Sequence, residues 1–309
     1  GGADSDTVTR AAELQYNPLL GAVPTPNDLA FQASQDGTIN AELADPVTSD
    51  EPLDSQVSVN SLDGFSTMAP STATFTRAID ASSIAPGTNV RVFEVPTDPT
   101  TKAVTGPAIG ELTAGTDFTA TVSAANPNDT TLAVTPLAPL NESSSYLVVV
   151  TDGIRARDGA AFRASELYQL AKSSNPLFDG QSSTVPSLTD EQAEAMEAVR
   201  QLTQSYLAVT QGAGIASQDI IGTWSFSTQS VGDTLAGIRA GLENRQGNGN
   251  SAFFADDQGN PNQLVDTGSD TQPDGAGHIY AGVLTGNPAN NAAEFPYYLE
   301  GTPSDPQSV

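Results

Sequence analysis

Residues 131–162 read TLAVTPLAPLNESSSYLVVVTDGIRARDGAAF, and the fold is decided in this stretch. An alternating segment, 131–136, is followed by a nearly continuous apolar segment that begins at Ser145 and ends at turn residues Asp152-Gly153. Alternation is typical of a strand with one buried face, and a short continuous apolar run is typical of a strand buried on both faces. The stretch therefore predicts two β-strands and a turn, with no group of polar residues suited to catalysis.

Further strand patterns with turn residues between them lie on both sides of this stretch. They are 71–79, 88–95, 117–125 and 220–228. Many short strands joined by turns are typical of a β-sandwich.

Two segments have a helical pattern instead. Residues 165–178 place apolar side chains at helical spacing, and residues 187–214 do so over a longer distance. In the longer segment Thr189 and Gln192 form a potential capping box, which predicts a helix start. Its apolar stripe is Met196, Val199, Leu202 or Thr203, Tyr206 and Val209 or Thr210. We interpret this stripe as core packing.

The charge of the chain limits its partners. The formal net charge is −26, from 37 acidic and 11 basic residues. Nucleic acid binding needs clustered Lys and Arg, and an anionic membrane surface would repel such a chain, so neither is an expected partner. A strongly solvated, salt-adapted exterior is the favoured interpretation, and a cation or cationic partner is the alternative. No apolar run approaches the roughly 20 residues that span a bilayer.

Several of these segments together resemble bacterial Ig-like domains. The resemblance rests on ATFTRAIDASSI at 73–84, on the step from Pro139-Leu140 to Tyr146, on the turns Asp152-Gly153 and Asp158-Gly159, and on IIGTWSFST at 220–228. It implies an Ig-like β-sandwich in which the helices precede the last strand as an insertion.

A resemblance that covers most of residues 16–300 is to the N-terminal region of the bacterial virulence-factor lipases. It rests on NSLDGFSTMAPSTATF at 60–75, on the long strand with its helical insertion, and on HIYAGVL at 278–284 with FPYYLEG at 295–301. The resemblance implies a lipid-ester hydrolase acting on phospholipid or lysophospholipid, with its serine, acid and histidine in a downstream α/β-hydrolase domain. Gly1-Gly2 resembles the residues that follow the lipid-bearing cysteine of such lipoproteins, although the chain has no cysteine.

The expected fold is mainly β, an Ig-like β-sandwich with an inserted α-helical subdomain and the lead-in to a missing α/β-hydrolase domain. The expected parts are a flexible tether at 1–20, the sandwich at 21–228 with its helical insertion at about 165–214, a helix packed on the sandwich at 229–245, a linker at 246–277, and the start of a truncated catalytic domain at 278–309.

No catalytic residue is predicted within the chain. A nucleophile elbow needs G-x-S-x-G, and the nearest match, Gly64-Phe65-Ser66-Thr67-Met68, lacks the second glycine, so Ser66 is interpreted as a turn residue. His278 is the single histidine, and nothing places a serine beside it, so we interpret it as a strand-end residue. Structural or catalytic zinc is excluded by one histidine and no cysteine.

The remaining candidate binding residues are acidic pairs and the two lysines. Glu191 with Glu194 is explained by the helix dipole, and Asp152 with Asp158 by turns. Calcium is the cofactor most compatible with the composition, with Asp256, Asp257 and Asn260 as candidates, although their spacing departs from a calcium-loop motif and a solvated acidic loop is favoured. The two lysines, Lys102 and Lys172, are isolated in sequence and form no phosphate-binding motif.

The chain is therefore expected to be a non-catalytic accessory region of an extracellular lipase or phospholipase. It would space or scaffold the catalytic domain and shape the access of lipid. A free-standing Ig-like adhesion or binding module is the alternative, and a hydrolase in its own right is the third. The expected location is extracytoplasmic, as an outer-membrane surface lipoprotein or a secreted protein of a Gram-negative bacterium, and the acidic exterior suits a marine one.

Overall fold

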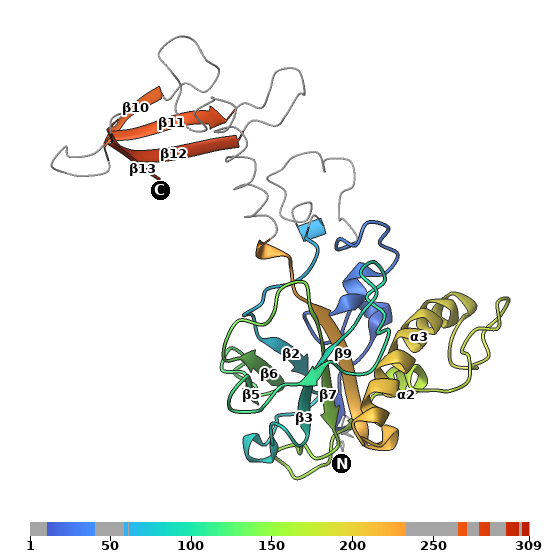
Figure 1. Ribbon diagram of the computed structural model, residues 1–309. Helices are drawn as coiled ribbons and strands as arrows, with labels where there is room; N and C mark the ends of the chain where they lie inside the picture. The colour runs from blue at the N-terminus through green and yellow to red at the C-terminus, as the bar shows by residue number, and fades with distance from the viewer. Residues whose placement is uncertain are drawn as a thin grey trace, which may run out of the picture. The chain divides into compact units, whose positions relative to one another are not determined.

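The computed structural model describes residues 11–40, 59–60 and 62–232, together with the backbone of four later strands between Val265 and Ser308 (Figure 1). The chain divides into two compact units, Gly1–Val231 and Gly232–Val309. Strands from several sheets dominate the described residues, which confirms the prediction of a mainly β fold.

The first unit contains two antiparallel sheets and one short parallel pair. The three-stranded sheet has the order β2 (Ser71–Thr74), β6 (Thr131–Pro136), β5 (Phe118–Val122). The four-stranded sheet has the order β4 (Gly110–Glu111), β3 (Val90–Val95), β7 (Ser145–Thr151), β9 (Ile220–Ser227). The parallel pair is β1 (Glu13–Leu14) with β8 (Arg163–Ala164).

Strands β7 and β9 form the centre of the core. They pair antiparallel, with Tyr146 opposite Phe226 and Val148 opposite Trp224. Every residue of β9 and all but the last of β7 are buried. The prediction that the apolar run at Ser145 is a strand buried on both faces is confirmed, because water is excluded from both sides of these strands.

One face of β9 is directed toward the three-stranded sheet. Trp224 is fully buried there, and its Nε1 donates a hydrogen bond of 2.8 Å to Ser71 Oγ in β2. Phe75 and Phe162 meet edge to face in the same core, with ring centroids 4.6 Å apart. A buried Trp N–H needs a partner, so this bond aligns the two sheets as well as satisfying the indole.

The alternate residues of β9 are directed toward helices α2 (Glu166–Ala171) and α3 (Asp190–Gly212), which lie beside this strand in Figure 1. Tyr168 OH lies 2.7 Å from Thr223 Oγ1, and Tyr206 OH lies 2.8 Å from Ser225 Oγ. Since successive strand residues point to opposite faces, Thr223 and Ser225 of β9 meet the helices while Trp224 meets the sheet.

Helix α3 begins as predicted, because Thr189 and Gln192 form a capping box. Of the alternatives in its apolar stripe, Thr203 is buried while Leu202 is half-buried, and Val209 and Thr210 are both buried. The threonine hydroxyls donate to the helix's own carbonyls, Thr203 to Val199 O and Thr210 to Leu207 O. This local bonding lets threonine occupy an apolar position.

The prediction of a flexible tether at 1–20 is wrong for residues 11–20. Leu14 is fully buried and Tyr16 is 5% exposed. Leu14 fills the space above Gly222 of β9, where a Cβ atom would lie 2.8 Å from Leu14 Cδ1. This burial of apolar side chains holds the segment in place, although its polar surroundings in sequence gave no periodic signal. It continues into two short 3₁₀ helices, η1 (Pro18–Leu20) and η2 (Asp28–Phe31).

In the second unit, strands β10 (Val265–Asp270), β11 (His278–Leu284), β12 (Phe295–Thr302) and β13 (Asp305–Ser308) form one antiparallel sheet in that order. The prediction of a linker at 246–277 is wrong for Val265–Asp270, because this segment pairs its backbone with β11. Backbone pairing needs no apolar side chains, so a polar composition concealed this strand. Of the helix expected at 229–245, residues 231–232 are helical, residues 229–230 are not, and residues 233–245 lie outside the described residues.

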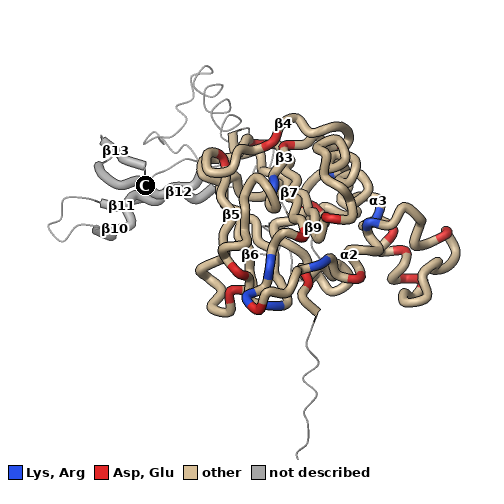
Figure 2. The backbone as a smooth tube through the Cα atoms, turned by 90° about the horizontal axis from the view of Figure 1, so that it is seen from below, with Lys and Arg blue, Asp and Glu red and all other residues tan. Residues whose placement is uncertain are grey.

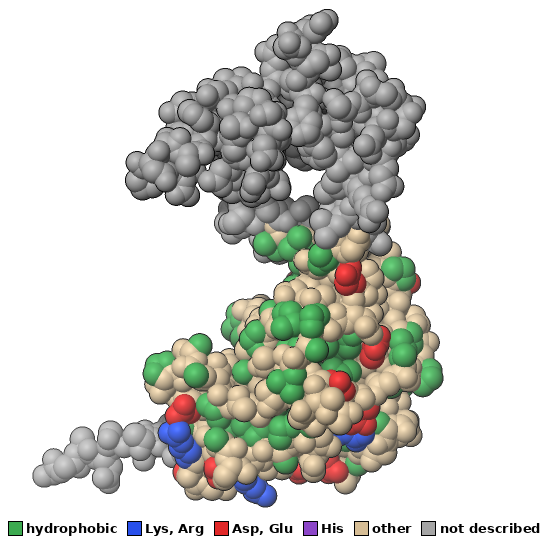
Figure 3. Space-filling model, turned by 60° about the vertical axis from the view of Figure 1, so that its left-hand side comes forward, with side chains coloured by type: hydrophobic (Ala, Val, Ile, Leu, Met, Phe, Trp, Pro, Cys, Tyr) green, Lys and Arg blue, Asp and Glu red, His purple; other side chains and the backbone are tan. Residues whose placement is uncertain are grey.

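The surface of the first unit mixes acidic and apolar side chains. Acidic residues occur on its loops and on α3, and Lys and Arg occupy fewer positions (Figure 2). One face carries several groups of hydrophobic side chains, with acidic side chains among them (Figure 3). The large exposed hydrophobic residues are Leu20, Val59, Leu62, Met68, Ile109, Leu137 and Val231.

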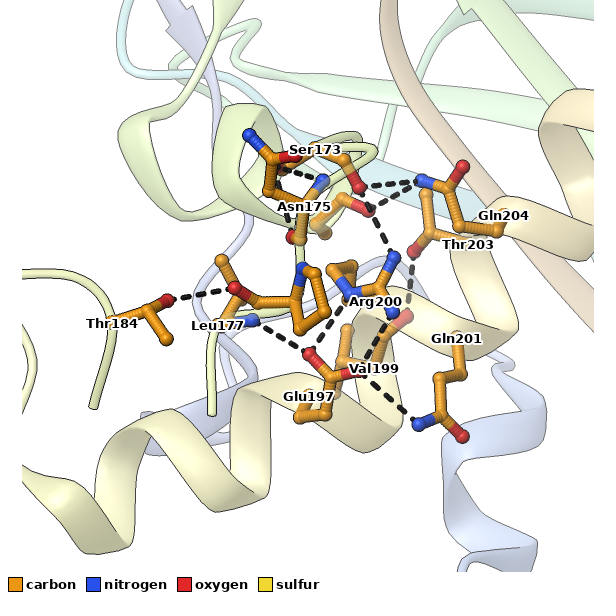
Figure 4. A network of polar contacts seen from close by, with 12 residues as sticks. Ser173, Asn175, Leu177, Thr184, Glu197, Val199, Arg200, Gln201, Thr203 and Gln204 are labelled. Carbon is orange, nitrogen blue, oxygen red and sulfur yellow. Dashed lines mark hydrogen bonds and ion pairs between the residues drawn. The ribbon is translucent and has the colours of Figure 1, made fainter. Parts of the chain in front are cut away.

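An ion pair on α3 fastens the loop that precedes this helix (Figure 4). Arg200 donates to Glu197 through Nε at 2.9 Å and Nη2 at 2.7 Å, and both side chains are less than a fifth exposed. Glu197 also accepts the backbone N–H of Leu177, and Arg200 donates to Ser173 O. The hydrogen bonds from Arg200 lower the pKa of Glu197 from 4.5 to about 2.

We expect Glu197→Gln to lower the free energy of unfolding at pH 7 by about 1–3 kcal/mol, because Arg200 loses its charged partner. The pKa of Glu197 is depressed in the folded state, so its contribution is present above the ordinary glutamate pKa and is lost as the pH falls toward about 2. Urea unfolding of both proteins between pH 2 and pH 7 measures this. Glu194→Gln, on the exposed face of α3, is the control and should change little.

We expect Gly64→Ala to destabilise the first unit by about 1–3 kcal/mol, because a Cβ would force the backbone apart. That atom would lie 2.4 Å from both Gln229 N and Thr228 C. The two backbones are close there because Phe65 N donates to Ser227 O and Phe65 O accepts from Gln229 N. Gly110→Ala is the matched control, because nothing lies within 4 Å of its Cβ position. Equal urea midpoints for the two variants would contradict the close approach at Gly64.

Candidate functional site

The most unusual group in the first unit is the buried carboxylate of Asp28. Pro24 and Pro26 precede it and disfavour a regular strand, and Asn27 caps η2 by accepting the N–H of Leu29 at 3.0 Å. The 3₁₀ helix carries Asp28, which is 2% exposed, onto β9. There the carboxylate accepts from Ser225 Oγ at 2.5 Å, Ser227 N at 2.7 Å and Ser227 Oγ at 3.2 Å.

These bonds belong to a longer polar network inside the fold. At one end, Tyr206 OH of α3 lies 2.8 Å from Ser225 Oγ. At the other, Ser227 Oγ lies 2.7 Å from Ser145 Oγ of β7, which lies 2.7 Å from Thr97 Oγ1. Each hydroxyl can both donate and accept, so the network keeps the buried carboxylate satisfied.

Burial raises the pKa of Asp28 from 3.8 to about 6, because a charged carboxylate is poorly solvated there. The hydrogen bonds from Ser225 and Ser227 and the positive charge of Lys102 oppose this shift. Burial also raises the pKa of Tyr206, and the charge of Asp28 adds to the effect. Asp28 therefore changes protonation near neutral pH.

Lys102 reaches the same region from the loop that follows β3. Asp98 organises that loop by accepting the N–H groups of Thr100 and Thr101 on its side chain. Lys102 follows with a positive φ of 56° and is 8% exposed. Its Nζ lies 4.6 Å from the centre of the Phe31 ring, at the end of η2.

Two pockets adjoin this network. One of about 480 Å³ is lined by Asp28 and by apolar residues that include Leu29, Phe31 and Leu202. The other, of about 310 Å³, is lined by Thr97, Ser145 and Ser227 of the network, by Lys102, and by Asp36, Gly37, Asp63, Pro99, Ser143 and Thr228. The hydrogen bond from Ser227 to Asp28 therefore connects the walls of the two pockets.

This arrangement can hold a proton and can bind a small polar ligand. Among the described side chains, no histidine lies beside the serines, and no group of three acidic, histidine or cysteine residues could hold a metal ion. Nucleophilic catalysis by serine requires a base within hydrogen-bond reach. The base within reach of a serine here is the carboxylate of Asp28, and both it and its partner Ser225 are buried, so the described site has no exposed pairing of nucleophile and base.

The elbow-like segment has a structural role. Ser66 Oγ accepts the N–H groups of Met68 and Ala69, both at 3.1 Å, which is the geometry of a serine turn and agrees with its interpretation. Gly64 is required by the close approach of backbone at Thr228 and Gln229.

The other candidates are not brought together at this site. Asp158 forms an ion pair with Arg77 at 2.7 Å, and Asp152 bonds through its backbone to Asp219 O. Glu191 and Glu194 are exposed on α3. Asp256, Asp257 and Asn260 lie outside the described residues, as does the side chain of His278, so calcium binding there stays a prediction.

Sequence reasoning missed Asp28 and the burial of Lys102. Asp28 stands 197 residues from Ser225, so no local spacing connects them. The available signal is Asn27-Asp28 after two prolines, a combination typical of a capped turn.

Comparisons with known proteins place the chain among the N-terminal regions of bacterial lipases. Residues 20–252 match the family described as bacterial virulence factor lipase N-terminal, and the chain belongs to this family. No curated protein matches it.

Two solved structures share a limited similarity, the S-layer protein rSbsC(31-844) and surface layer protein SbsC, domains 1-6. Each is 19% identical over 32% of this chain and 11% of that chain, with a TM-score of 0.22. The overlap is too small to define the fold. In the described part of the chain, no helix has the length and apolar character needed to cross a bilayer.

We expect the stability that Asp28 contributes to fall as the pH rises from about 4 to about 6. The pKa of this acid is higher in the folded than in the unfolded state, so the unfolded chain loses its proton first. The loss should be roughly 3 kcal/mol, since each pKa unit corresponds to about 1.4 kcal/mol. Urea unfolding of the wild-type chain and of Asp28→Asn, as a function of pH, measures the difference.

The Asn variant has no proton to exchange at this position, so the difference in unfolding free energy between the two proteins isolates Asp28. Above about pH 7, one unit beyond the raised pKa, that difference should be constant. A difference that does not vary between pH 4 and pH 7 would show that the pKa of Asp28 is not raised.

Proposed function

We propose that this chain is a non-catalytic accessory region of a lipase-like or phospholipase-like ester hydrolase. The observation that carries the proposal is the family match over residues 20–252. The buried polar network supports it, because its serines are hydrogen-bonded to the buried Asp28 and to one another, and no described histidine side chain lies beside them. The accessory region spaces or scaffolds the catalytic domain and shapes the access of lipid to it.

We infer further that the first unit is an Ig-like β-sandwich with an inserted helical subdomain. Two antiparallel sheets with a shared core support the sandwich. Strands β7 and β9 are paired neighbours although residues 152–219, with α2 and α3, separate them in sequence. That arrangement supports an insertion before the last strand.

Residues 278–309 are proposed to begin the catalytic domain. Support comes from the sheet of β11, β12 and β13, which belongs to a unit separate from the first. The serine, acid and histidine of the hydrolase would follow in a longer chain. The proposed location is outside the cytoplasm, on the bacterial surface or secreted, which the family description and the acidic composition support.

The test compares the 309-residue chain with a version extended through the downstream coding sequence. Hydrolysis of p-nitrophenyl butyrate and of a lysophospholipid is measured for both. We expect activity in the extended protein alone, because the catalytic groups would lie beyond Val309. His278→Ala in the extended protein should leave that activity unchanged, since His278 is not proposed to touch substrate.

Activity in the 309-residue chain that His278→Ala abolishes would overturn the proposal and make this chain a hydrolase. If neither protein hydrolyses either ester, an adhesion or binding module becomes the better explanation.

A further inference from the structure

The side chain of Lys102 is nearly buried, and its ammonium group has no hydrogen-bond partner among the described residues. Lys102 is 8% exposed, and the contact its Nζ makes is with the face of the Phe31 ring at 4.6 Å. Lys172 shows the contrast, because its Nζ donates to Ser217 O at 2.8 Å and to Ile220 O at 2.7 Å. One of the two lysines is therefore satisfied by the fold and the other is not.

An ammonium group has three donors, and those of Lys102 have no acceptor among the described residues. Its Nζ is not one of the buried polar atoms that lack a partner, so the group is open to the pocket that Lys102 lines. The charge of Lys102 acts on the carboxylates of Asp28 and Asp98, which accept hydrogen bonds from Ser225 and Ser227 and from Thr100 and Thr101 and leave the lysine donors free. Lys102 also has a positive φ of 56°, which is uncommon for a residue other than glycine.

Lys102 lines the pocket of about 310 Å³, within the size range of small-ligand sites. Hydroxyl groups make up much of the wall, from Thr97, Ser143, Ser145 and Ser227. Ser143 also has a positive φ, of 49°, so two of the four non-glycine residues with this backbone conformation in the described chain line one pocket. Hydroxyls and one ammonium are suited to bind an anion through oxygen atoms.

We propose that this pocket binds a singly charged oxyanion, a carboxylate or a phosphodiester group, through the ammonium of Lys102. The single charge follows from Asp36 and Asp63, which line the same pocket and repel a more highly charged anion. The net charge of −26 also repels a more highly charged anion. The site is independent of the proposed accessory role, because it lies wholly within the first unit.

The two lysines of the chain allow a direct test on the intact 309-residue protein. With ¹³C-labelled lysine, the ε-carbons of Lys102 and Lys172 give two NMR signals, and Lys172→Arg identifies them by removing one. Acetate and octanoate test the carboxylate, dimethyl phosphate tests the phosphodiester, and inorganic phosphate tests a more highly charged anion. The Lys102 signal should move saturably, and the Lys172 signal should stay in place.

A second variant measures how much of the binding depends on the charge. Lys102→Met keeps an apolar stem on Phe31 and should weaken binding by about 10-fold to 100-fold, as expected for the loss of a hydrogen bond to a charged group. Arg163→Gln removes one positive charge from the surface, where this side chain is 66% exposed, and should leave the affinity unchanged.

The probes also separate the sources of the ligand. Tighter binding of octanoate than of acetate would indicate a fatty acid, equal binding a small organic acid, and preference for dimethyl phosphate a phosphodiester such as a lipid headgroup. A Lys102 signal that no probe moves overturns the proposal. So do equal shifts at both lysines, equal weakening by Lys102→Met and Arg163→Gln, or tightest binding of inorganic phosphate.

Discussion

Strand β9 has no face left for water, and the architecture of the first unit follows from that constraint. Its even-numbered residues need an apolar cover, which the three-stranded sheet provides around Trp224. Thr223, Ser225 and Ser227 on its other face carry hydroxyls, so the opposite cover must supply hydrogen bonds as well as volume, and Tyr168 and Tyr206 do both. The strand thus requires two different partners, and the helices are as much part of its environment as the sheets.

The carboxylate of Asp28 completes the hydroxyl-bearing face of this strand. It accepts two side-chain donors and one backbone donor from a single strand, which fixes η2 in register with β9. A neutral residue of the same shape could fill the space, but the charge makes the region sensitive to its surroundings, since Lys102 lies close enough to act on it. A polar network buried this deeply specifies one arrangement of its members because each alternative leaves a group unpaired.

Local patterns predicted the elements better than the contacts between them. The run at Ser145 and the capping box at Thr189 were readable because strand burial and helix capping act over a few residues. The burial of Leu14, Asp28 and Lys102 could not be predicted from local sequence patterns, because each depends on a surface formed by distant segments. The polar composition of Val265–Asp270 predicted a linker, but this segment forms a strand by pairing its backbone with β11.

The contact of residues 11–31 with β9 also limits when the core of the first unit can be completed. During synthesis, Leu14 and Asp28 emerge from the ribosome long before β9, in which Ser225 is separated from Asp28 by 197 residues. The early segment can already pair with residues around β2, as Leu14 does with Phe75 and Thr25 with Thr72. The side that faces β9 has to wait for that strand, and closing so long a loop is slow, so the core is completed late in synthesis.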